Sequence, residues 1–159
     1  MTVQRILRLA LLVLGLLVLI GTTVFIAVRW QTIPAEVPAH YDAAGHITDY
    51  DGKKSLLSVM GLNWVLYLFL AFTAHNPAMQ NRSVGPFRIR VSGVRFGSKT
   101  VLPATGLMLD LLALIVALLF SYLTICSALG RELGAWFLPV TLIACLVPLL
   151  IPLITHLRK

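Results

Sequence analysis

Residues 9–28 read LALLVLGLLVLIGTTVFIAV, twenty consecutive residues without a single charge. At about 1.5 Å of rise per residue, a helix of this length spans the roughly 30 Å hydrocarbon core of a bilayer. Three further apolar stretches of similar or greater length follow, at residues 56–74, 101–129 and 133–157. The chain is 58% hydrophobic and only 12% charged, so its apolar surface must face lipid. We therefore predict an all-α integral membrane protein, a single domain over residues 1–159 that forms a bundle of four transmembrane helices.

The lysines and arginines predict the orientation, because short loops rich in them stay in the cytoplasm. Nine of the thirteen flank one side of the predicted spans: Arg5, Arg8, Arg82, Arg88, Arg90, Arg95, Lys99, Arg158 and Lys159. We expect both termini and the basic loop 75–100 to be cytoplasmic, in a bacterial cytoplasmic membrane, and the loop 29–55 to be outside. The net charge of +7 thus follows the topology, and nucleic acid is not an expected partner.

The outer loop contains a polar segment, HYDAAGHITDYDGKK at residues 40–54, between apolar stretches. Pro34 and Pro38 disfavour helix before it and predict an extended lead-in. The glycines at 45 and 52 indicate turns, so we expect a structured loop that folds back compactly.

Three interpretations of this loop stay open. Imidazoles and carboxylates together suit a divalent metal, held by His40, His46, Asp42 and Asp49, although no defined metal signature is present and no other cofactor is indicated. In the second, the same residues cap turns and pair with neighbouring lysines. In the third, the acidic and aromatic loop, with Tyr41, Tyr50 and Trp30, recognises a cationic amphipathic ligand.

The string Val37-Pro38-x-His40-Tyr41-Asp42-x-x-Gly45, followed by Asp49 and Lys53, resembles a known pattern. It is similar to the Ile-Pro-x-His-Phe-Asn-x-x-Gly-x-x-Asp-x-x-x-x-Lys motif of a bacterial membrane domain of unknown biochemistry. Immunity proteins that protect a sporulating cell from its own sporulation-delaying toxin peptide share that domain. The resemblance covers about residues 33–74 and implies a ligand-binding loop built from His40, Tyr41, Asp42, Gly45, Asp49 and Lys53.

This chain departs from the pattern at two positions. Asp42 stands where Asn is frequent, and Thr48 stands where the acid is usual, so that Asp49 follows one residue later. The longer immunity proteins carry a second half with a Gly-Ile-Arg-Thr type motif, which Gly97-Ser98-Lys99-Thr100 matches poorly. The chain therefore resembles the first module alone.

Asp110, Asn63 and Tyr67 are polar residues within predicted spans. An intramembrane carboxylate is costly and marks either an ion path or an interhelical hydrogen bond. Pro148 and Pro152 free the carbonyls of Ala144 and Pro148 on the fourth span, so we expect Asp110 to meet these acceptors or Tyr67. Asn63 is expected to join helices.

The basic loop contains FRIRVSGVRF at residues 87–96, which predicts a short hairpin lying on lipid headgroups. No catalytic motif appears in the chain, so an enzyme is the weaker class. We expect a small membrane protein that binds or senses a membrane-active peptide or envelope component, in the manner of an immunity protein. The alternatives are a metal-dependent membrane enzyme using the loop, and a subunit of a transporter or complex with another membrane protein that uses Asp110.

Overall fold

The computed structural model describes the backbone of residues 3–76 and 102–157, and the side chains of residues 3–76 and 105–150. Within these ranges the chain forms four helices and one two-stranded sheet. Their bounds are α1 Val3–Arg29, β1 Glu36–Tyr41, β2 Ile47–Gly52, α2 Ser55–His75, α4 Leu102–Ala128 and α5 Phe137–Leu157. The predicted hairpin at residues 87–96 lies outside the described residues.

Three of the helices, α1, α2 and α4, are long and apolar enough to cross a membrane. They contain the predicted spans 9–28 and 56–74 and most of 101–129. The fourth helix, α5, is apolar but shorter where its side chains are described, over Phe137–Leu150. It begins at Phe137 and not at the predicted residue 133, because Gly130 and Gly134 adopt positive φ angles of 64° and 80° that interrupt helical geometry.

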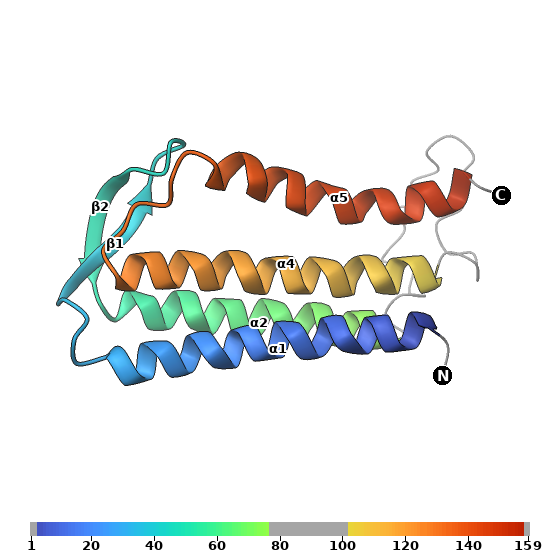
Figure 1. The fold of residues 1–159 in the computed structure, drawn as a ribbon, viewed down its shortest axis with the longest axis horizontal. Coiled ribbons are helices and arrows are strands. Elements are labelled where there is room, and N and C mark those ends of the chain that lie inside the picture. Colours follow the sequence, from blue (N-terminus) through green and yellow to red (C-terminus); the bar gives the residue numbers. More distant parts are fainter. Residues whose placement is uncertain (1–2, 77–101, 158–159) are drawn as a thin grey trace, which may run out of the picture.

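The helices form a bundle in which α4 contacts α1, α2 and α5 (Figure 1). Small residues on α4 allow close approach: Ala113 and Ala117 are buried in one core cluster with Leu19 of α1 and Tyr67 of α2. The opposite surfaces of α1 and α5 expose many leucines, isoleucines and valines. Surfaces of this composition suit contact with lipid tails.

The hairpin β1–β2 covers one end of the bundle, and the start of α1 and the end of α5 lie at the other end (Figure 1). The strands pair antiparallel, with Glu36 opposite Gly52 and Tyr41 opposite Ile47, and the register shifts on both sides of His40. The four helices agree with the predicted all-α class, and the loop folds back compactly, as predicted, but it does so as a two-stranded sheet. Val37 and Ile33 pack with Ile26, Leu56 and Ala128, so that a second core cluster joins the hairpin to the helix ends.

Candidate functional site

The turn of the hairpin is organised by Asp42. Its Oδ1 accepts hydrogen bonds from the backbone amides of Ala44 at 2.9 Å and His46 at 2.8 Å. These bonds, that of His46 above all, lower the pKa of the Asp42 carboxyl below its usual value. Gly45 closes the turn with φ of +85°, which side chains rarely adopt. Asp42 and Gly45 of the predicted ligand set therefore build the turn.

The hairpin rests on the end of α4 and on the α4–α5 connection at three places. The amide of Leu133 donates to the carbonyl of Gly45 at 3.0 Å, and the hydroxyl of Tyr41 donates to the carbonyl of Arg131 at 3.4 Å. The hydroxyl of Ser127 donates to the carbonyl of Pro38. These contacts join segments about ninety residues apart in the chain and hold the hairpin in one position over the helices.

The four predicted metal ligands lie in two pairs on the hairpin. His40 Nδ1 lies 3.7 Å from Asp49 Oδ2, and His46 Nδ1 lies 3.3 Å from Asp42 Oδ2. All four side chains are exposed, so each pair is weak on its own. Among the described residues, no group of three or more His, Cys, Asp or Glu side chains is placed to hold a metal ion. The structure does not bring the four together as one set, and metal binding stays a prediction.

An open groove of about 900 Å³ lies between the hairpin and the end of the bundle. This volume is within the range of pockets that bind small molecules. His40, Tyr41 and Lys53 of the predicted ligand set line this hairpin groove, whereas Asp42, Gly45 and Asp49 do not. The remaining lining comes from the hairpin, the end of α1 and the facing turns of α2 and α4: Trp30, Ala35, Pro38, Ala39, Asp51, Gly52, Lys54, Ser55, Leu56, Ser58, Val59, Leu123, Thr124 and Ser127.

Two side chains of the groove have unusual surroundings. Partial burial raises the pKa of the Tyr41 phenol to about 12, and the neighbouring Cys126 contributes in the same direction. The ammonium of Lys53 lies 5.1 Å from the centre of the Trp30 ring and donates to the Trp30 carbonyl at 3.4 Å. Lys53 thereby fastens the start of α2 to the end of α1.

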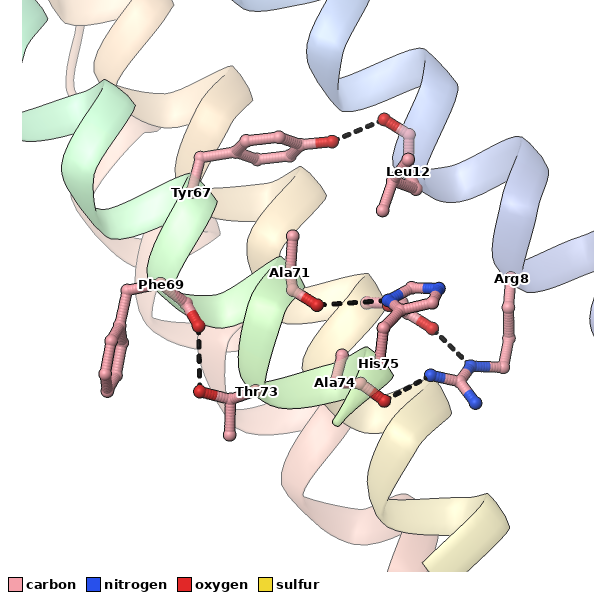
Figure 2. Close-up of polar contacts among 9 residues, drawn as sticks. Arg8, Leu12, Tyr67, Phe69, Ala71, Thr73, Ala74 and His75 are labelled. Atoms are coloured by element: carbon pink, nitrogen blue, oxygen red, sulfur yellow. Dashed lines mark hydrogen bonds and ion pairs between the residues drawn. The ribbon is translucent and has the colours of Figure 1, made fainter. Parts of the chain in front are cut away.

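Asp110 meets partners that differ from the predicted ones. Its Oδ2 accepts from Nε of Arg8 at 2.5 Å, and its Oδ1 lies 3.5 Å from Nδ1 of His75. Arg8 also donates to the carbonyl of Ala74 at the end of α2, so that one guanidinium bridges three helices (Figure 2). Gly106 makes room for it, since a Cβ there would lie 2.8 Å from Cζ of Arg8. The ion pair gives Asp110 a structural partner, and its use in transport stays a prediction.

The other two intramembrane polar residues join helices. Asn63 donates to the carbonyl of Ala117 at 3.3 Å and reaches the hydroxyl of Ser121 at 3.4 Å. The ring of Tyr67 packs against Gly15, and its hydroxyl donates to the carbonyl of Leu12 on α1 instead of meeting Asp110 (Figure 2). Both residues are buried between helices.

Sequence reasoning missed both Arg8, which it assigned to topology, and His75 as partners of Asp110. The feature that could have identified Arg8 is its depth along the bundle. Arg8 lies a few residues inside α1 and Asp110 lies a few residues inside α4, at the same end of the bundle. It also missed Lys54 and Ser58 as groove residues, because nothing local indicates that a hairpin covers the first turns of α2.

Comparison with known proteins gives a match to a protein family over part of the chain. A family model described as "Domain of unknown function (DUF1648)" matches residues 17–63, a bacterial membrane-associated domain. The matched segment runs from within α1, through the whole hairpin, into α2, and it includes every residue of the loop motif. No curated protein and no solved structure matches the chain significantly.

Proposed function

We propose that this chain is a multi-pass protein of the bacterial cytoplasmic membrane, with both termini inside and the hairpin outside. The start of α1 and the end of α5 lie at the end of the bundle opposite the hairpin (Figure 1), as this topology requires. The distribution of basic residues along the sequence supports the direction. Labelling of a Thr48→Cys variant in intact cells tests it: a membrane-impermeant maleimide should react with position 48, and reaction only after cell lysis would reverse the orientation.

We further propose that the protein binds a membrane-active peptide or another amphipathic component of the envelope in the hairpin groove, and so resembles an immunity protein in function. The observation that carries this proposal is the groove itself, in which His40, Tyr41 and Lys53 of the motif line one concave surface. Two motif residues that do not line it, Asp42 and Gly45, form the turn that rests on the α4–α5 connection.

The hairpin wall of the groove is also held in place by contacts within the protein itself. The bonds from Ser127 and Leu133, together with the packing of Val37 against Ile26 and Leu56, fix the hairpin at both of its ends. A preformed site loses less conformational entropy on binding than a flexible loop does. The groove is therefore suited to bind a ligand on a surface that is already formed.

The test is survival of bacteria that express the protein when they are challenged with a panel of membrane-active peptides. Ala39→Trp places an indole in the groove, and Thr48→Trp places the same side chain at an exposed position of β2 outside it. At matched membrane abundance, protection should be lost in Ala39→Trp and kept in Thr48→Trp. Equal protection by the two variants would refute binding in the groove, and no protection by the unchanged protein would refute the peptide ligand.

A further inference from the structure

The lining of the hairpin groove changes character from floor to rim. Leu56 and Val59 of α2 and Leu123 of α4 supply apolar side chains at the end of the membrane-spanning bundle. The rim, on the side of the hairpin, carries the charged and aromatic groups. A ligand that fills the groove therefore has an apolar portion beside the helices and a polar portion beside the hairpin.

The charges on the rim favour an anion. Lys53 and Lys54 line the groove against a single carboxylate, that of Asp51, and the imidazole of His40 is also part of the lining. The other acidic residues of the hairpin region, Glu36, Asp42 and Asp49, are exposed outside the lining. The loop is acidic as a sequence, but the surface that it presents to a ligand is basic.

The start of α2 adds to this preference. Lys54 is the N-cap residue and makes no side-chain cap hydrogen bond, and the first turn of α2 contains no acidic residue. The helix therefore directs the positive end of its dipole toward the groove without a carboxylate to neutralise it. Ser55 and Leu56 of this first turn are themselves part of the lining.

We propose that the occupant of the groove is an anionic phospholipid of the adjacent leaflet. Its phosphate lies beside Lys53, Lys54 and the first turn of α2, and one acyl chain runs along Val59 and Leu123. The inference rests on the proposed binding role of the groove and names the chemical class of the ligand. It replaces a cationic ligand, which the loop sequence favoured, by an acidic one.

The experiment uses the full-length protein in phosphatidylcholine vesicles that contain a rising fraction of brominated phosphatidylglycerol or brominated phosphatidylcholine. Bromine quenches tryptophan fluorescence at short range, and Trp30 lines the groove. Subtracting the quenching of a Trp30→Phe variant isolates the contribution of Trp30 from those of Trp64 and Trp136. We expect the quenching of Trp30 to saturate at a low fraction of brominated phosphatidylglycerol. With brominated phosphatidylcholine, the quenching should rise only in proportion to the fraction of that lipid in the vesicle.

Each basic residue near a membrane surface favours anionic lipid by about fivefold, so Lys53→Gln/Lys54→Gln should raise the half-saturating lipid fraction by at least about tenfold. Arg131→Gln, an exposed substitution outside the groove lining at the same end of the bundle, is the matched control; it removes surface charge without changing the site and should raise that fraction by at most about fivefold, less than the double variant does. Equal quenching by the two lipids would overturn the anionic ligand while leaving an amphipathic occupant in place. A Trp30 response to a peptide but not to lipid would overturn the lipid and keep the proposed function, and no response to either would overturn both.

Discussion

Removing the positive partner of Asp110 should destabilise the bundle strongly. The Asp110 side chain is 1% exposed, and Arg8 supplies its 2.5 Å ion-pair contact. Breaking a buried ion pair by removing one partner costs about 3–5 kcal/mol, because the other charge is left without compensation. Arg8→Met should therefore remove about that amount, roughly a fifth or more of the total stability of a typical domain.

The reverse substitution behaves differently. In Asp110→Asn the guanidinium of Arg8 keeps its bond to the carbonyl of Ala74 and is 23% exposed, so the loss should be smaller. In the Arg8→Met background, Asp110→Asn removes the uncompensated charge and should restore stability. The sign of the Asp110→Asn effect thus reverses between the two backgrounds.

The assay is reversible unfolding of the purified protein in mixed micelles by a denaturing detergent, followed by circular dichroism at neutral pH. Arg5→Met is the control, since Arg5 is exposed on the same helix and its loss should change stability by less than about 0.5 kcal/mol. If the losses of Arg8→Met and Asp110→Asn simply add in the double variant, the two side chains do not interact and the assignment is wrong.

Three further predictions concern the hairpin. Gly45→Ala should destabilise the turn by at least about 1–2 kcal/mol, since a Cβ there would lie 2.7 Å from backbone atoms of Gly134 at an unfavourable φ. Amide hydrogen exchange should therefore rise across the hairpin in this variant. Gly52→Ala is the control and should leave the exchange unchanged. The raised pKa of Tyr41 means that its neutral form is favoured in the folded state. The folded protein should therefore lose stability as pH rises from about 10 to about 12, and Tyr41→Phe should remove this dependence in alkaline unfolding curves. The lowered pKa of Asp42 has the opposite effect. The stability that the Asp42 carboxylate contributes is complete above the usual aspartate pKa and is lost as pH falls through the lower pKa of the folded state. Asp42→Ala should abolish this acid dependence, as followed in NMR spectra of the hairpin.

The positions of the helices could be predicted because lipid imposes a simple requirement on the sequence. In lipid, a long uncharged run such as residues 9–28 has to form all its backbone hydrogen bonds within the protein, and a helix forms them within the run itself. The first residue of a helix is less determined: α1 begins at Val3 and includes Arg5 and Arg8, because arginine can be accommodated in a helix when its head reaches water or a partner.

The hairpin could be predicted only as a compact loop. Pro38 and a mixed polar sequence hide the alternation that marks strands, and the register shifts on both sides of His40 disturb it further. The partner of Asp110 could not be predicted for another reason, since adjacency between α1 and α4 is set by packing of the whole bundle. His40 and Asp49 do lie opposite each other in the hairpin. The groove, however, depends on residues near 127–134, which support the hairpin from about ninety residues further along the chain.

The hairpin therefore depends on residues that lie outside the segment matched by the family model. The family match ends at residue 63, but the contact surfaces for Pro38, Tyr41 and Gly45 lie at Ser127, Arg131 and Gly134. A chimera that inherits only the matched segment would carry the hairpin without the platform beneath it. In this chain the platform is the tight corner between α4 and α5, in which Gly130 and Gly134 adopt positive φ, so the hairpin and this corner form one structural unit.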